Sequence, residues 1–390
     1  KAGIKYVMSE TSEERFELTL PLPGNLYFYD YYVTYEGSEK EVKLQDPANP
    51  SPKNAWNGHD DGHSTFRVGT PTNTTKGQEY IYSSNVPHGK VEFVTYKAAD
   101  GTEQPLGVYL PANYDASKTY KTLYVSHGGG GNEFEWMSLG AAPTIMDNLI
   151  AAKQVDETIV VTMDHTYFKW KYDVIAENFE KHMIPFIEAN YSVSKEIEDR
   201  ALCGLSMGSM TTSTMMLKYP DLFGYYGNFS GANLNAIAKE DIDVEKLKTK
   251  GIYVTAGNID MALMASNGNL SNKTVGLAKL LDELGVEYTY DLKGGAHDWG
   301  VWRAELTTFA KDVLWEADYE GASSYKPGAT TEVNTTDEYK DTDYTTTFVY
   351  EDQDDRRQYI RHNAVPTPFM IMAPNVPAQK IDYPIDVTSI

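Results

Sequence analysis

The chain has 390 residues, of which 41% are hydrophobic, and a formal net charge of -22 from 56 acidic and 34 basic residues. This length is enough for a large core together with a smaller second domain. The acidic balance argues against nucleic acid or an anionic membrane surface as a partner, and no apolar run approaches the roughly 20 residues that span a bilayer.

The first zone, residues 1–84, has an all-β pattern. Short strand-like runs such as Phe16–Leu20 and Leu26–Val33 alternate with Pro-Gly turns. This pattern predicts a small N-terminal β-sandwich domain. The run Gly58–His63 holds two His and two Asp residues, but it has no recognised metal-ligand spacing, so we favour a solvated loop and predict neither a metal nor a cofactor.

The second zone, residues 85–318, alternates strand and helix patterns and predicts an α/β domain. Several of its strands are almost continuously apolar, as expected when helices cover both faces of a mostly parallel sheet. The expected strands are 91–96, 106–110, 122–126, 158–163, 200–205, 225–229, 251–256 and 287–292, and the expected helices are 143–153, 174–190, 207–219, 271–285 and 302–315.

The third zone, residues 319–390, breaks this rhythm. Residues 321–347 are rich in Thr, Asp, Tyr and Ser and predict a linker. The apolar, proline-punctuated run Val365–Met372 predicts an extended C-terminal segment lying on a folded surface. We assign no role to this zone from sequence.

The ends of the chain and its cysteine content bear on where the protein works. The chain begins at Lys1 rather than at Met, so we expect a removed signal segment and a secreted, cell-surface or periplasmic location in a bacterium. Cys203 is the one cysteine, which excludes an intrachain disulfide, and we expect it to be a small buried strand residue.

The most informative motif is Gly-Leu-Ser-Met-Gly at residues 204–208. An apolar run leads into it and a helical pattern follows, which is the strand–turn–helix context of a nucleophile elbow. The pattern predicts an α/β-hydrolase fold with Ser206 as nucleophile.

A serine nucleophile needs a base and an acid that orients the base. Of the two histidines after Ser206, His297 follows the last predicted strand, whereas His362 lies in the charged tail. We therefore predict His297 as the base. Asp260 follows the preceding strand and is the favoured acid, because Asp298, the alternative, is adjacent to the histidine in sequence and is better placed to fix the loop.

A glycine-rich loop supplies candidate oxyanion donors. Residues 124–131 read Tyr-Val-Ser-His-Gly-Gly-Gly-Gly, a strand followed by four glycines. One donor would be the backbone N–H of Met207. The second would come from Gly129, with Gly128 or Gly130 as alternatives.

Together these stretches resemble carbohydrate esterase family 1, the esterase-D-like branch of the hydrolase fold that includes feruloyl and acetylxylan esterases. The resemblance covers most of residues 90–315 and is carried by 107–114, 123–131 with Trp136, 184–191, 204–208, 257–260, and 295–299 with Trp302. It implies Ser206, Asp260 and His297 as triad and the amides of Gly129 and Met207 as oxyanion hole. The N-terminal zone is similar to early-set immunoglobulin-like modules.

The resemblance implies removal of feruloyl or acetyl groups from a plant polysaccharide such as xylan, or from its esterified oligosaccharides, through an acyl-enzyme. Trp136 and Trp299 are the favoured substrate-binding aromatics, with Tyr167 and Trp170 as further candidates. One departure is Ser209-Met210 after the elbow, where relatives often carry a further glycine. Oligomeric state is not predicted.

Three other functions remain open at this point. One is an enterobactin-type siderophore esterase, whose anionic catecholate substrate the acidic chain would repel. A second is mycolyl transfer, for which no lipid-binding pattern is present. The third is a non-catalytic carbohydrate-binding protein, which gives no reason for all the catalytic residue types to be in place.

Overall fold

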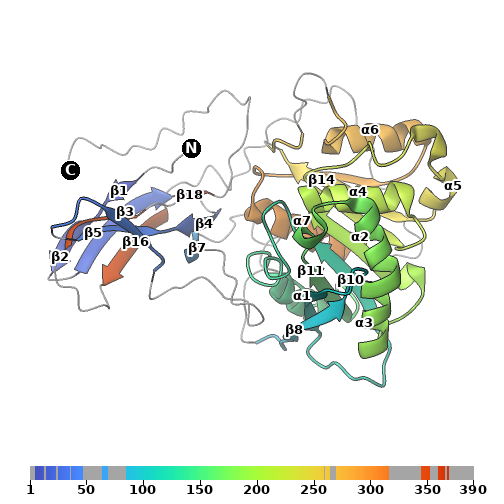
Figure 1. The fold of residues 1–390 in the computed structure, drawn as a ribbon, viewed down its shortest axis with the longest axis horizontal. Helices are drawn as coiled ribbons and strands as arrows, with labels where there is room; N and C mark the ends of the chain where they lie inside the picture. Colours follow the sequence, from blue (N-terminus) through green and yellow to red (C-terminus); the bar gives the residue numbers. More distant parts are fainter. Residues whose placement is uncertain are drawn as a thin grey trace. The chain divides into compact units, whose positions relative to one another are not determined.

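Two compact units make up the chain, residues 1–75 with 335–390 and residues 76–334. Each is described by itself (Figure 1). The computed structural model describes residues 5–12, 15–22, 25–35, 37–46, 64–68, 85–258, 260–263, 269–315, 344–351, 359–364 and 367–368.

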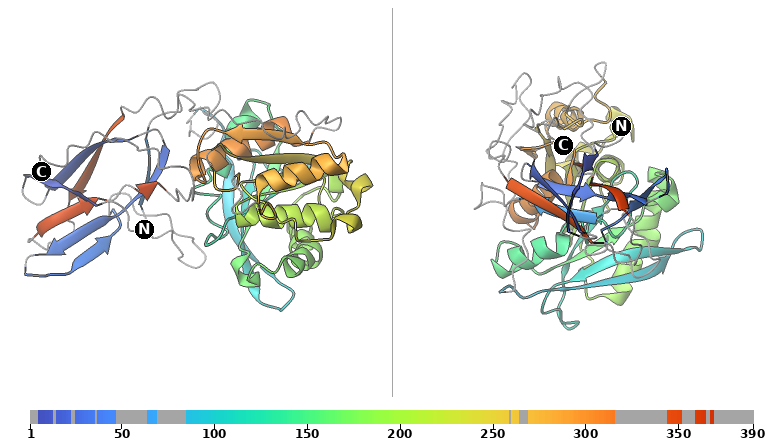
Figure 2. Two further views of the ribbon diagram at one scale, coloured as in Figure 1. Left: turned by 90° about the horizontal axis from the view of Figure 1, so that it is seen from above. Right: turned by 90° about the vertical axis from the view of Figure 1, so that its left-hand side faces the viewer.

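The larger unit is built on an eight-stranded mixed sheet. Its spatial order is β15-β14-β13-β12-β10-β11-β9-β8. The six strands from β10 to β15 run parallel, whereas β9 is antiparallel to β11 and β8 to β9. Figure 2 shows the antiparallel pair in cyan at one edge. The strands are β8 (Lys90–Lys97), β9 (Glu103–Leu110), β10 (Lys121–Ser126), β11 (Thr158–Met163), β12 (Arg200–Leu205), β13 (Tyr225–Phe229), β14 (Gly251–Gly257) and β15 (Thr289–Lys293).

The strand order reverses beside β10, which lies between β12 and β11 although it precedes both in sequence. In open parallel sheets, the crevice beyond the carboxyl ends of the strands at such a switch point is the usual place for a ligand site. A functional site is therefore expected at the residues that follow β10 and β12.

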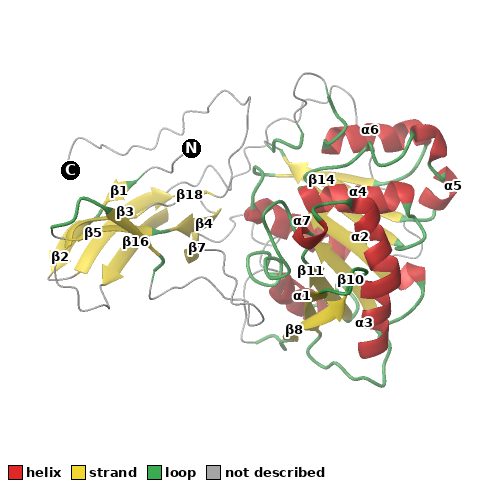
Figure 3. Cartoon of the chain, viewed as in Figure 1, coloured by secondary structure: helices red, strands yellow, loops and turns green. Residues whose placement is uncertain are grey.

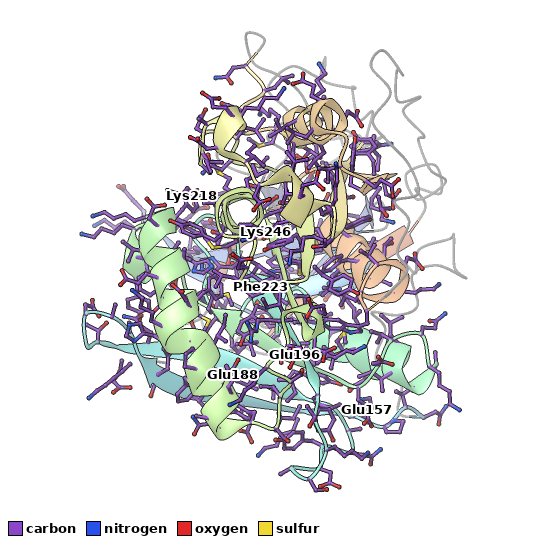
Figure 4. All side chains as sticks on the ribbon, turned by 90° about the vertical axis from the view of Figure 1, so that its right-hand side faces the viewer. Glu157, Glu188, Glu196, Lys218, Phe223 and Lys246 are labelled. Carbon is purple, nitrogen blue, oxygen red and sulfur yellow. The ribbon has the colours of Figure 1, made fainter. Side chains whose placement is uncertain are left out.

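Helices cover both faces of this sheet (Figure 3). On one face, side chains of α2, α3, α4 and α6 form a buried cluster with Tyr124, Leu202 and Tyr226. On the opposite face, Phe309 of α7 stacks on Tyr253 of the sheet. Helix α7 also contacts α1. Figure 4 shows Phe223, a member of the first cluster, amid the packed side chains. The helices are α1 (Ala142–Ala151), α2 (Tyr172–Asn178), α3 (Ile184–Asn190), α4 (Met207–Lys218), α5 (Val244–Leu247), α6 (Thr274–Leu284) and α7 (Trp299–Asp312), with short 3-10 turns η1 (Thr166–Phe168), η3 (Ile197–Asp199) and η4 (Lys239–Asp241).

One predicted helix is interrupted. The sequence predicts a continuous helix over 174–190, but a π-helical segment, η2 (Phe179–Met183), separates α2 from α3. Pro185 lies in the first turn of α3. Because proline has no N–H and its ring crowds the carbonyl four residues earlier, a regular α-helix cannot continue through this position without distortion.

Among its described residues, the smaller unit contains three small sheets. They are ordered β1-β17-β5-β6, β16-β3-β2 and β18-β4-β7. Met8, Phe16 from β3 and Val33 from β5 belong to one buried cluster, so side chains from two of the sheets pack together. The strands are β1 (Tyr6–Val7), β2 (Ser9–Ser12), β3 (Arg15–Leu22), β4 (Asn25–Tyr29), β5 (Tyr31–Tyr35), β6 (Glu41–Leu44), β7 (Ser64–Val68), β16 (Tyr344–Glu351), β17 (Tyr359–Ala364) and β18 (Thr367–Pro368).

Residues 344–347, which the sequence places in a linker, belong to strand β16. Strand β16 pairs antiparallel with all of β3, from Tyr344 opposite Leu22 to Glu351 opposite Arg15, and β17 pairs with both β1 and β5. Strands β16, β17 and β18 thus join the N-terminal sheets, whose free edges need partners. A pattern read along the chain does not reveal pairing across more than 300 residues. The run 58–63 and residues 319–343 lie outside the described residues. Of the predicted extended segment 365–372, the structure describes 367–368, which pair with β4.

Candidate active site

Ser206 lies in a sharp turn between β12 and α4, at the switch point of the sheet. Its backbone is in the left-handed region, with φ 52° and ψ -114°. Non-glycine residues hold such a conformation only where the surroundings enforce it. The Ser206 N–H donates to the carbonyl of Phe229 at the end of the neighbouring β13 (2.9 Å), and α4 begins at the next residue, Met207.

The two glycines of the motif are explained by close packing. A Cβ atom on Gly208 would lie 2.5 Å from the carbonyl oxygens of both Ser126 and His127, and one on Gly204 would lie 2.6 Å from the backbone of Gly208. Any side chain at these positions would push α4 away from β12 and from the loop after β10. The glycines therefore let three backbone segments meet at Ser206.

His297 follows β15 and reaches Ser206. Its Nε2 lies 3.0 Å from Ser206 Oγ, and the ring is 4% exposed. Its Nδ1 lies 2.9 and 3.1 Å from the two oxygens of Asp260, which follows β14 and is fully buried. Since a carboxylate only accepts, Nδ1 carries the proton that it donates to Asp260, and Nε2 is left to accept the serine proton.

Asp298, the alternative acid, has a different role. Its carboxylate accepts from the backbone N–H of Val301 (3.0 Å) and caps the N-terminus of α7. Burial raises the pKa of Asp298 to about 6, although backbone hydrogen bonds to its carboxylate lower the pKa in part. Asp260 is instead fixed by the N–H of Ala262 (2.7 Å), which orients its carboxylate toward the imidazole.

The glycine-rich loop after β10 lies against the elbow. It contains a turn in which the Gly131 N–H donates to the Gly128 carbonyl (3.2 Å). A Cβ atom on Gly128 would lie 3.4 Å from Ser206 Cβ, and one on Gly129 would lie 2.8 Å from the Met207 sulfur. The structure thus brings the predicted donor residues Gly129 and Met207 together beside Ser206.

Trp136 and Trp299 do not fit the predicted role as substrate-binding aromatics. Trp136 is 0% and Trp299 2% exposed, and their rings pack edge to face with centroids 5.2 Å apart. Trp136 also donates through Nε1 to the carbonyl of Ser126 (3.0 Å). Both rings belong to the interior, so neither can stack on a ligand. Closeness in sequence to the catalytic motifs gave no information on which way the rings point.

Two other residues near the site were not among the predicted site residues. Trp302, on α7, meets the imidazole of His297 edge-on, and its Nε1 donates to the hydroxyl of Ser230 (3.1 Å). Ser230 directly follows β13 and, like Ser206, has a positive φ of 58°. The one sequence signal for Ser230 is its position at the carboxyl end of a parallel strand adjacent to β12.

Exposed aromatic surface is present at the loop after β11. Tyr167 is 51% exposed, and Trp170 contacts the rings of His127 and His165 edge-on. This loop follows the strand beside β10, at the same edge of the sheet as Ser206. Among the aromatic candidates, Tyr167 is the most exposed, Trp170 is partly buried, and the other two are buried.

A third buried carboxyl group lies behind the triad. Glu305 on α7 is 0% exposed and accepts from the Thr255 hydroxyl (3.1 Å). Burial and, second to it, the charge of Asp260 raise the pKa of Glu305 well above its ordinary value. This shift favours the protonated form of Glu305, and Asp260 is the carboxyl group that faces His297.

Within the described residues, no group of three or more His, Cys, Asp or Glu side chains is arranged to hold a metal ion. Among the same residues, no helix has the length and apolar character needed to cross a membrane.

Comparison with known proteins gives a consistent set of relatives. The chain is 33% identical over 249 residues to an endo-1,4-beta-xylanase/feruloyl esterase of Xylanibacter ruminicola, an alignment that covers 60% of this chain and 33% of that protein. It is 29% identical over 242 residues to endo-1,4-beta-xylanase Y of Acetivibrio thermocellus, covering 54% of this chain and 22% of that protein. The chain thus spans a third or less of the length of these relatives.

A similar fold occurs in a ferulic acid esterase of carbohydrate esterase family 1 from Anaeromyces mucronatus, solved with ferulic acid. The TM-score is 0.53 at 21% identity, over 64% of this chain and 98% of that one. This likeness supports the α/β-hydrolase fold for the larger unit. The family model Esterase, described as "Putative esterase", matches residues 98–313, which is more than half of the chain and contains Ser206, Asp260 and His297. The chain belongs to this esterase family.

Proposed function

We propose that this protein is a serine carboxylesterase that removes feruloyl groups from xylan-type plant polysaccharide or from its oligosaccharides. The observation that carries the proposal is the hydrogen-bonded series from Ser206 Oγ through the His297 ring to Asp260. A buried series with these distances and this tautomer has the parts needed to activate a serine hydroxyl.

The reaction proceeds in two steps through an acyl-enzyme. His297 Nε2 takes the Ser206 proton as Oγ attacks the ester carbonyl, and Asp260 stabilises the imidazolium that forms. The imidazolium then gives that proton to the leaving sugar hydroxyl as the C–O bond breaks. In the second step His297 activates a water molecule, which releases the carboxylic acid and frees Ser206.

The developing oxyanion is bound by two backbone N–H groups. The Met207 N–H is one donor, because it is an unpaired amide at the start of α4 next to the nucleophile. The Gly129 N–H is the second, since the loop that holds it lies against Ser206 and Met207. Each such donor lowers the barrier by about 3 kcal/mol.

The substrate class is supported by the relatives and by charge. Both relatives reported above are named as xylanases, and one of them also as a feruloyl esterase. A chain of net charge -22 suits a neutral polysaccharide better than an anionic ligand. An aromatic acyl group would find an exposed ring in Tyr167 at the same edge of the sheet. Acetyl groups on xylan are the second candidate substrate. A polymeric substrate places the enzyme outside the cell.

The test compares initial rates on methyl ferulate, feruloylated arabinoxylan oligosaccharides and acetylated xylan. We expect Ser206→Ala to abolish ferulate release without changing the unfolding transition. Ser209→Ala, in the first turn of α4, should remain active. Wild-type protein that releases acetate but no ferulate would reject the feruloyl assignment. Activity of Ser206→Ala close to that of wild type would reject the mechanism.

A further inference from the structure

We propose that His127 is a positioning residue for the oxyanion hole. Its imidazole fixes the peptide bond between Gly128 and Gly129 in the orientation that turns the Gly129 N–H toward Ser206. This inference rests on the proposed function, because it assigns the Gly129 amide as an oxyanion donor.

The hydrogen bonds of His127 define what its ring does. The ring is fully buried, and its Nδ1 lies 2.6 Å from the carbonyl oxygen of Gly128. A carbonyl only accepts, so Nδ1 must be the protonated nitrogen and must donate to Gly128. Nε2 accepts from the backbone N–H of His165 at 3.0 Å, which is closer than the Asp164 carboxylate at 3.4 Å. The ring is therefore held at both nitrogens.

The direction of the Gly129 N–H follows from peptide geometry. In a trans peptide the C=O of one residue and the N–H of the next point in opposite directions, and the protein has no cis peptide bond among its described residues. With the Gly128 carbonyl directed at His127, the Gly129 N–H points away from His127. Ser206 and Met207 lie against these two glycines, as the 3.4 and 2.8 Å approaches to their Cβ positions show.

A constraint from outside the glycine run 128–131 is needed because glycine peptides rotate easily. They let the backbone come close to the reacting carbonyl, but a peptide between two glycines meets little steric resistance to a flip. A flipped peptide would direct a carbonyl oxygen, not an N–H, at the developing negative charge. The Gly131 N–H also donates to the Gly128 carbonyl (3.2 Å). Because Gly131 belongs to the same glycine run, this hydrogen bond does not tie the run to the rest of the protein. His127 anchors that run to the body of the protein.

His127 is itself held from behind. Trp170 packs edge-on against the rings of both His127 and His165, at centroid distances of 5.3 and 5.7 Å. Trp170 has a positive φ of 53°, a costly conformation for this residue that persists only where packing enforces it. Burial lowers the pKa of His165 to about 3, so no positive charge builds up beside His127.

Three substitutions at His127 separate its donor function from its bulk. The amide nitrogen of Asn takes the place of Nδ1 and can still donate to Gly128. The longer side chain of Gln carries its amide at the place of Nε2, and Phe fills the space with no donor. His182→Asn, in η2, is the matched control.

We expect His127→Gln and His127→Phe to lower kcat on methyl ferulate about 100-fold, the loss of one oxyanion donor, with KM within about threefold of wild type. The kcat of His127→Asn should be at least about tenfold higher than that of the Gln and Phe variants. The kcat of His182→Asn should match that of wild type. The affinity for phenylboronic acid, which forms a tetrahedral adduct with the serine, should fall in parallel with kcat, while the affinity for ferulate should not change. The pH dependence of kcat/KM should stay that of wild type, because His297 is untouched.

Equal rates for the Asn and Gln variants, or a loss confined to KM, would overturn the positioning role. If His127→Phe does not fold, the Asn and Gln pair decides the question by itself. Failure of the proposed function looks different, because the wild-type protein would then neither hydrolyse methyl ferulate nor bind phenylboronic acid, and the positioning role would fall with it.

Discussion

Trp302 meets the imidazole of His297 edge-on, with 4.9 Å between the ring centroids. Its indole nitrogen is bound to the Ser230 hydroxyl, so the ring that flanks the histidine is fixed by a residue at the end of β13. The imidazole is therefore held from two directions, by Asp260 through a hydrogen bond and by Trp302 through packing.

Replacing Trp302 by Phe should lower kcat about tenfold, because a smaller ring without the Ser230 hydrogen bond lets the imidazole move away from Ser206 Oγ. The matched control is Trp315→Phe. Trp315 likewise donates through Nε1 to a hydroxyl, that of Thr158, but Thr158 begins β11 at the opposite edge of the sheet. Both variants should lose about 1 kcal/mol of unfolding free energy, and equal kcat values for the two would contradict this role of Trp302.

Replacing Asp260 by Asn should lower kcat about 10⁴-fold, because an amide no longer favours the required tautomer and does not stabilise the imidazolium. Asp298→Asn should stay within about tenfold of wild type, since Asn caps a helix about as well as Asp does. Steady-state rates on methyl ferulate check both values. If Asp298→Asn were the more damaged enzyme, Asp298 would have to replace Asp260 as the orienting acid.

Glu305→Gln should change how stability depends on pH. Because burial raises the pKa of Glu305 in the folded chain, the folded chain releases this proton at a higher pH than the unfolded chain, which releases it around the ordinary pKa of 4.5. The folded state thus binds more protons, and the unfolding free energy of wild type falls as pH rises above about 4.5, by at most about 1.4 kcal/mol per pH unit. This loss ends only above the raised pKa. Below about pH 4.5 the contribution of Glu305 is fully present.

Urea unfolding between pH 4 and 8 measures this effect as a difference between the two proteins. Glu305→Gln cannot ionise, so its stability should rise relative to wild type with increasing pH. If the unfolding free energies of the two proteins change with pH in parallel, Glu305 has the same pKa in the folded and the unfolded state, which would contradict this prediction.

Gly208→Ala should damage activity more than stability, because a Cβ atom 2.5 Å from two carbonyl oxygens forces α4 away from the loop that carries Gly129. We expect kcat to fall at least about 100-fold, the effect of losing an oxyanion donor. Ser209→Ala is the neighbouring control. It removes one hydrogen bond to the Gly231 carbonyl (2.8 Å) and should cost about 1 kcal/mol of stability with kcat near wild type. Similar kcat values for the two variants would contradict the steric account.

The convergence of Ser206, Asp260 and His297 could be predicted from the sequence, because local patterns and chain order determine it. The strands 158–163, 200–205 and 225–229 have the predicted bounds, and Ser206, Asp260 and His297 each follow the carboxyl end of a predicted strand. In a parallel sheet, such positions converge at one edge. The distances between the three side chains agree with this expectation.

The failures have a common physical origin. The burial of Trp136 and Trp299 depends on which face of the loop or helix packs inward, and the pairing of β16 with β3 joins segments more than 300 residues apart. Both depend on tertiary contacts that leave no periodic trace in the chain. The hydrogen bonds of Ser230 and His127 are equally invisible in a linear pattern, although His127 stands within the predicted loop.

The most direct test of the central claim is covalent labelling with a fluorophosphonate, followed by intact-mass measurement and peptide mapping. An activated Ser206 predicts one phosphonyl adduct per chain, located on Ser206, absent in Ser206→Ala and formed far more slowly in His297→Asn. No adduct on the folded wild-type protein, or an adduct that persists unchanged in Ser206→Ala, would contradict the assignment of Ser206 as nucleophile.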